Sequence, residues 1–124
     1  MMVKDSAVNA VRVRIAQKDK VNKVRYEIML PVNLNDGSPQ PPELLLRTIK
    51  EIVQQMGGCS FEPGIIEGTW VHDGKVFKDL NSRVTADVDF TPANLQFFEN
   101  LKLALEARFQ QHSIYITRHP IEVI

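Results

Sequence analysis

The sequence has few of the residues that most chemical sites require. Its 124 residues include one cysteine, Cys59, which excludes an internal disulfide and any site with several thiolate ligands. The three histidines, His72, His112 and His119, lack the spacing of metal ligands on a helix or a strand. We therefore expect no metal site and no cofactor, and no residue is singled out as catalytic.

An excess of charge of one sign and long apolar runs are also missing. Lys plus Arg and Asp plus Glu each number 15, so no net charge attracts a nucleic acid or an anionic membrane. No segment approaches the roughly 20 apolar residues of a membrane span, and the N-terminal segment lacks the apolar stretch of a signal peptide. Together with the single cysteine, these features predict a cytoplasmic protein with no membrane contact.

The length and an apolar fraction of 44% predict one folded domain, residues 1–124. We divide it into an additional N-terminal strand and turn at 1–21, a core at 22–117 and a C-terminal extension at 118–124. Apolar and polar residues alternate at 11–15, 24–32 and 83–90, which indicates strands with one buried face. A last strand is predicted at 113–117. Asp73 and Gly74 fit a type I′ turn, so we also predict a hairpin with arms at 65–72 and 75–78.

Two segments have the apolar spacing of amphipathic helices. The first follows Pro41 and Pro42 and ends near Gly57, and the second starts at Thr91 as N-cap, with Pro92 in its first turn. The element order is β-α-β-β-α-β after the additional strand. It predicts an α+β, ferredoxin-like sandwich with an antiparallel sheet, both helices on one face, and strands 24–32 and 83–90 in the centre.

The sheet face away from the helices is expected to be charged. It would display Arg25, Glu27 and Met29 beside Thr85, Asp87 and Asp89. Three interpretations stay open: a solvated face with cross-strand ion pairs, a dimer interface, or a polar ligand site. The two aspartates argue against an RNA-binding platform, which needs exposed aromatic and basic residues.

Trp70 is the only tryptophan, and Gly68 lies two positions before it on the same strand face. A strand tryptophan is usually a packing residue, but the glycine leaves room for a ring, a bulged backbone or a ligand. One functional hypothesis is therefore a small enzyme or ligand-binding protein with a pocket between the sheet and this hairpin. Its candidate residues are Gly68, Trp70, His72, Arg25, Arg83 and Asp87. The arginines would hold an anionic group, and His72 or Asp87 would transfer protons.

Several of these residues also resemble a family of short bacterial proteins of unknown function. The resemblance rests on Gly68-x-Trp70, the turn at Gly74, the segment "DLNSR", and "RFQQHSI" from Arg108 to Ile114, and it covers about residues 24–117. It implies the same β-α-β-β-α-β core and no activity.

The leading hypothesis is a non-enzymatic module that forms a homo-oligomer, specifically a dimer, through a sheet face or edge. The predicted strand at 11–15 motivates it, because an added strand either covers an edge or pairs with a second copy. A further alternative is nucleic-acid binding through Arg12, Arg14, Lys18, Lys20, Lys23 and Arg25, although the balancing acidic residues make it the least expected. No small-molecule ligand is identified by these residues.

Overall fold

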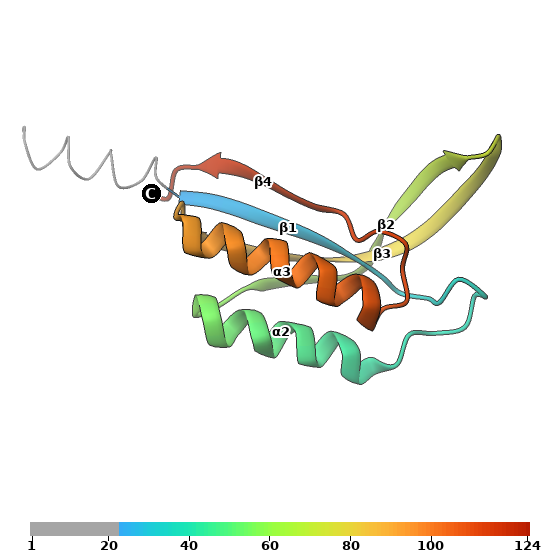
Figure 1. The fold of residues 1–124 in the computed structure, drawn as a ribbon, viewed down its shortest axis with the longest axis horizontal. Coiled ribbons are helices and arrows are strands. Elements are labelled where there is room, and N and C mark those ends of the chain that lie inside the picture. Colours follow the sequence, from blue (N-terminus) through green and yellow to red (C-terminus); the bar gives the residue numbers. More distant parts are fainter. Residues whose placement is uncertain (1–22) are drawn as a thin grey trace, which may run out of the picture.

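A computed structural model describes residues 23–124 of the chain (Figure 1). The elements in order are β1 (Lys23–Pro31), α2 (Pro42–Met56), β2 (Ser60–His72), β3 (Lys75–Asp89), α3 (Pro92–Arg108) and β4 (Ile116–Ile121). The strand predicted at 11–15 lies outside the described residues. Neither helix of the described part is long and apolar enough to cross a membrane.

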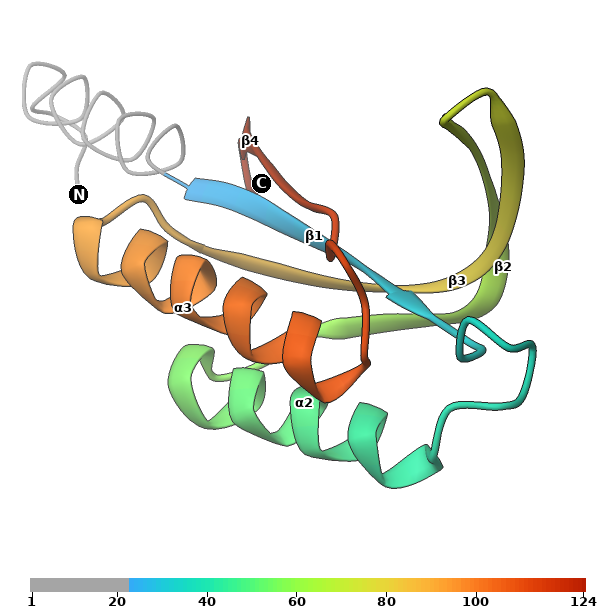
Figure 2. The same cartoon turned by 45° about the vertical axis from the view of Figure 1, so that its right-hand side comes forward.

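The four described strands form one antiparallel sheet in the order β2-β3-β1-β4, and both helices cover the same face (Figures 1 and 2). The predicted ferredoxin-like α+β architecture is thus confirmed, with β1 and β3 in the centre. Neither α2 nor α3 lies on the opposite face of the sheet, which we call the open face.

The core lies between the sheet and the helices. Alternate residues of β1 and β3 point into it, because each strand has one face against the helices. Tyr26 of β1 stacks on Phe98 of α3 with ring centroids 3.9 Å apart. The buried apolar residues are Val24, Tyr26, Ile28, Leu30, Ile52, Val84, Ala86, Val88, Phe98, Leu101, Leu105, Phe109 and Ile114.

The two helices begin and end at the predicted signals. The Thr91 side chain accepts a hydrogen bond from the backbone N–H of Asn94 at 3.1 Å, and Pro92 occupies the first turn of α3. Helix α2 ends at Gly57, whose φ of 88° is the left-handed conformation that glycine adopts readily.

An ion pair between a buried arginine and a partly exposed glutamate joins the helices. The Arg108 side chain is only 6% exposed, and its guanidinium donates to Glu51 Oε2 at 3.1 Å and to Thr48 Oγ1 at 2.8 Å. Thr48 is fully buried, and its hydroxyl in turn donates to the Leu44 carbonyl oxygen. Arg108 therefore ties the end of α3 to the middle of α2.

Several strand boundaries differ from the prediction, and β2 begins at Ser60 rather than at 65. The hairpin arm predicted at 75–78 and the strand predicted at 83–90 are a single strand, β3. The last strand begins at Ile116 rather than at 113. The Ile114 N–H donates to Glu106, and its carbonyl oxygen accepts from Lys102, so this residue is held against α3. At its other end, β4 pairs with β1 as far as Ile121 and so includes part of the segment interpreted as a C-terminal extension.

Candidate functional site

The strands β2 and β3 continue beyond the helices as a long hairpin, whose residues 66–80 we call the hairpin arm. Figures 1 and 2 show that it bends away from the face covered by the helices. Pairing continues to His72 opposite Lys75, and positive φ angles of 50° at Asp73 and 74° at Gly74 give the predicted two-residue turn.

A bulge lies where the hairpin arm leaves the sheet. Glu62 pairs with Arg83 and Ile66 with Asn81, so residues 63–65 of β2 lie opposite Ser82 alone. The Ser82 hydroxyl is buried and accepts a hydrogen bond from the Gly64 N–H at 2.9 Å. Such bulges bend a strand and increase its twist, which fits the change of direction seen here.

An aromatic pair occupies one face of the hairpin arm. Trp70 lies opposite Phe77, and their rings stack with centroids 4.4 Å apart. The indole Nε1 of Trp70 donates to Asp79 Oδ2 at 2.7 Å. Asp79 lies opposite Gly68, and since glycine has no side chain, the carboxylate can lean along the strand toward the indole.

The nearest side chain to the space above Gly68 is that of Asn81. A Cβ atom added at Gly68 would lie 3.5 Å from Asn81 Nδ2, an ordinary contact distance. Sequence reasoning placed Gly68 and Trp70 on one face but missed Phe77 and Asp79, whose roles depend on the cross-strand register.

The other face of the hairpin arm is also apolar. Val71, Val76 and Leu80 are 67%, 64% and 42% exposed, and Trp70 on the first face is 46% exposed. Because β3 alternates strictly, the aromatic face continues the open face of the sheet, while these aliphatic residues continue the helix side beyond the helices. The hairpin arm therefore exposes apolar side chains on both of its faces.

The charges of the open sheet face are paired across the strands. Arg25 donates to both carboxylate oxygens of Asp87, at 2.7 and 2.9 Å, and Lys23 pairs with Asp89. The hydrogen bond from Arg25 holds the pKa of Asp87 below its usual value, although partial burial opposes the shift. The same hydrogen bond raises the pKa of Arg25. These are the cross-strand ion pairs expected for a solvated face, one of the three interpretations above.

Arg83 extends this network toward the bulge. Its guanidinium lies 3.7 Å from Glu27 and 3.4 Å from Glu62. From β4, His119 Nδ1 lies 3.7 Å from the same Glu27.

The six candidate ligand-binding residues do not form one cluster. Arg25 forms an ion pair with Asp87, and Arg83 lies within ion-pair distance of two glutamates. His72 lies at the turn of the hairpin arm, where its Nε2 is 3.3 Å from Asp73. Asp87 is ten residues from Phe77 along β3, or about 33 Å at ~3.3 Å per residue. A ligand-binding role for Gly68, Trp70, His72, Arg25, Arg83 and Asp87 therefore stays a prediction, without a shared pocket to support it.

Other kinds of site find little support in residues 23–124. No group of three His, Cys, Asp or Glu side chains lies close enough there to hold a metal ion. Cys59 is partly buried, and burial raises the pKa of its thiol, which disfavours the reactive thiolate. Of the six basic residues considered for nucleic-acid binding, only Lys23 and Arg25 fall within the described part, and both are paired with carboxylates.

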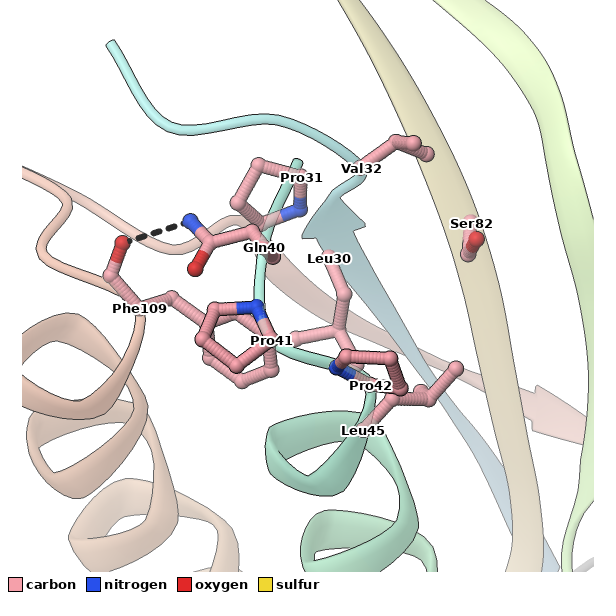
Figure 3. Close-up of a pocket in the computed structure, with 9 residues that line it drawn as sticks. All are labelled: Leu30, Pro31, Val32, Gln40, Pro41, Pro42, Leu45, Ser82 and Phe109. Atoms are coloured by element: carbon pink, nitrogen blue, oxygen red, sulfur yellow. Dashed lines mark hydrogen bonds between the residues drawn. The ribbon is translucent and has the colours of Figure 1, made fainter. Parts of the chain in front are cut away.

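A small cavity lies at the opposite end of β1 from Lys23 (Figure 3). Its volume is about 160 Å³, below the ~300–1,000 Å³ of typical ligand pockets. Its lining is mostly apolar, and the Gln40 amide nitrogen beside it donates to the Phe109 carbonyl oxygen at 2.9 Å. The cavity residues are Leu30, Pro31, Val32, Gln40, Pro41, Pro42, Leu45, Ser82 and Phe109.

Comparison with solved structures relates this fold to known proteins. The CutA1 protein of Oryza sativa matches with a TM-score of 0.61 and 17% identity, covering 86% of this chain and 85% of that chain. This chain shares its fold with CutA1 proteins. The divalent cation tolerance protein (CutA1) of Thermus thermophilus matches with a TM-score of 0.56 and 18% identity, over 80% of this chain and 84% of that one.

A phage SAM lyase in complex with S-methyl-5'-thioadenosine matches about equally well. Its TM-score is 0.61 at 14% identity, over 82% of this chain and 84% of that chain. All these identities are low, so the likeness to CutA1 proteins and to the lyase establishes the fold alone. No family model matches the sequence, and no curated protein matches it.

The resemblance to a family of unknown function was wrong. The structural neighbours include CutA1 proteins, which form a defined family. The residues that suggested the resemblance have local structural roles instead: Arg108 binds Glu51, Gly74 forms the turn, and Ser113 accepts a hydrogen bond from Lys102.

Proposed function

We propose that this chain is a non-enzymatic module that associates with further copies of itself, in the first instance as a dimer, through the hairpin arm. The observation that carries this proposal is the exposed apolar surface on both faces of the arm, at Trp70, Val71, Val76 and Leu80. A two-stranded ribbon alone is marginally stable in water, so contact with another molecule would stabilise it.

Charge balance favours a second copy as the partner. The chain has no net charge, so two copies do not repel one another over long distances. On the open face, Arg25 and Lys23 are already neutralised by Asp87 and Asp89 of the same chain. A copy that approaches this face therefore meets no uncompensated row of like charges.

The geometry supports binding better than catalysis. The candidate proton-transfer groups, His72 and Asp87, lie far apart, and Asp87 is already engaged by Arg25. The neighbours with this fold include proteins described as divalent cation tolerance proteins and a lyase, so the fold itself does not select one activity. A cytoplasmic location remains part of the proposal, supported by the single cysteine.

Self-association can be measured by sedimentation velocity from low to high micromolar protein, with Trp70 emission as a second readout. Trp70 is the only tryptophan and lies on the proposed surface, so its emission should shift to shorter wavelength as complexes form. A wild-type chain that remains monomeric at high micromolar concentration would refute the proposal.

Two substitutions on the hairpin arm distinguish this contact from non-specific hydrophobic association. The double variant Val71→Ser, Val76→Ser should weaken association about tenfold or more. Fully burying one valine side chain contributes roughly 1.5–3 kcal/mol, and about 1.4 kcal/mol corresponds to a tenfold change in the dissociation constant. Leu103→Ser on α3 is the matched control, since Leu103 and Val71 are both 67% exposed. The control should associate as the wild type does.

A further inference from the structure

Within residues 23–124, β2 is an edge strand with no neighbour on its outer side, and this edge offers a more specific contact than apolar side chains alone. We infer that two copies pair their backbones along this edge, from Ile66 to His72, as antiparallel strands related by a two-fold axis. This inference rests on the proposed self-association and specifies the surface that carries it. It requires that the backbone groups of this segment point outward, that the edge is unprotected, and that the segment fits a second copy.

The turn fixes the direction of the backbone groups. His72 and Lys75 flank a two-residue turn and therefore exchange their hydrogen bonds with one another. Since the direction alternates along a strand, the N–H and C=O groups of Val71, Thr69 and Glu67 point away from β3, toward the free edge.

A hydrogen bond on the other side of β3 supports this assignment independently. The Val32 N–H donates to the Leu80 carbonyl oxygen at 3.0 Å, so Leu80 points its backbone groups away from β2. Leu80 is the residue opposite Glu67. Glu67 is therefore not bonded to β3, as the turn geometry requires.

The edge from Ile66 to His72 lacks the usual protection against pairing. Edge strands are normally blunted by proline, lysine, bulges or short length. This segment contains neither proline nor lysine, and its pairing with β3 is regular over all seven residues. The other described edge, β4, is six residues long and contains Pro120. Figures 1 and 2 show that neither α2 nor α3 covers the hairpin arm.

The segment is complementary to itself. The bulge ends at Ile66 and the turn begins after His72, so the regular edge has Thr69 at its midpoint. Antiparallel pairing of two copies about Thr69 uses the whole edge and places Trp70 of one copy opposite Gly68 of the other. The large Trp70 side chain of one copy then lies beside Gly68 of the other, which has no side chain. Glu67 of one copy lies opposite Val71 of the other, so the two Glu67 carboxylates are not placed opposite one another. A second copy of this chain is therefore the partner that the segment fits.

Thr69→Pro tests the pairing directly. The Thr69 N–H is not bonded to β3, so proline removes an outward donor while it keeps the β2–β3 hydrogen bonds, a position that edge strands tolerate. We expect Thr69→Pro to weaken association more than tenfold, because both copies lose a hydrogen bond at the two-fold axis. Thr69→Ala, which keeps the N–H, should associate like the wild type.

Cysteine crosslinking tests the register without relying on proline. In a Cys59→Ser background, Thr69→Cys should form a disulfide-linked dimer under mild oxidation, since directly opposite residues lie about 5.5 Å apart between Cα atoms. Val71→Cys is the matched control, because its position faces Glu67 in the other copy and two such cysteines should not crosslink.

The outcomes separate this inference from the proposed function. If the wild type associates but Thr69→Pro associates equally well, edge pairing is refuted while self-association stands. If Val71→Cys crosslinks in preference to Thr69→Cys, the two-fold register is refuted. A monomeric wild type at high micromolar concentration refutes self-association itself.

Discussion

Replacing Arg108 by alanine is expected to lower the free energy of unfolding by about 2–3 kcal/mol. The guanidinium is 6% exposed and binds Glu51 and Thr48 of the neighbouring helix. Removing one partner of a buried pair usually costs about 3–5 kcal/mol, because the other charge is left without compensation. The Glu51 side chain is 36% exposed, so water can solvate its carboxylate and the expected cost lies at or below the lower limit of that range.

Urea denaturation of the wild type and the variant, followed by far-UV circular dichroism, measures this difference. Arg47→Ala is the matched control: Arg47 lies 3.9 Å from the same Glu51 but is 65% exposed, so its loss should cost less than about 0.5 kcal/mol. Equal small effects from both arginine variants would refute the idea that burial, rather than charge pairing alone, makes the Arg108 contact important.

Two further predictions concern the hairpin arm and the open face. Gly74→Ala should destabilise the fold by about 1 kcal/mol, because the φ angle of 74° at this position is unfavourable for alanine. Gly68→Ala should change the stability by less than about 0.5 kcal/mol, since the added Cβ would contact only Asn81, at 3.5 Å, and thermal unfolding of the two variants measures the difference. Asp87 has a lowered pKa through its hydrogen bond from Arg25, so its stabilising contribution is present above the ordinary value of 3.8 and is lost as the pH falls below it. Asp87→Asn should therefore lose less stability than the wild type on acidification, and identical acid profiles would contradict the pairing.

Local sequence patterns predicted most of the architecture. The alternation from Val24 to Leu30 identified β1, because that strand has one face against the helices and one away from them. Thr91 and Pro92 located the start of α3 for an equally local reason, since a cap satisfies backbone donors within one turn.

The continuity of β3 could not be predicted in this way. Residues 79–82 are mostly polar turn formers, and their strand conformation depends on partners from both sides. Glu67 lies opposite Leu80 on β2, while the Leu80 carbonyl oxygen accepts from Val32 after β1. Both partners are distant in the sequence, so local propensity gave the wrong boundary.

The candidate site was predictable only in part, for the same reason. Gly68 and Trp70 share a strand face by alternation alone, and the open-face position of Arg25 and Asp87 followed from the fold class. The contact of Trp70 with Asp79 depends on the register set by the turn and the bulge. The distance between the two groups of residues depends on the length of β3, which the sequence pattern divided into two strands.

The bulge at residues 63–65 also constrains how this chain can change in length. Three residues of β2 stand opposite one residue of β3, so two are supernumerary, and an even number preserves the alternation of faces beyond them. Insertions or deletions in pairs would therefore keep Trp70 beside Phe77. Loss of a single residue there would turn every side chain of the outer β2 segment to the opposite face, or force the turn at Asp73 to be rebuilt.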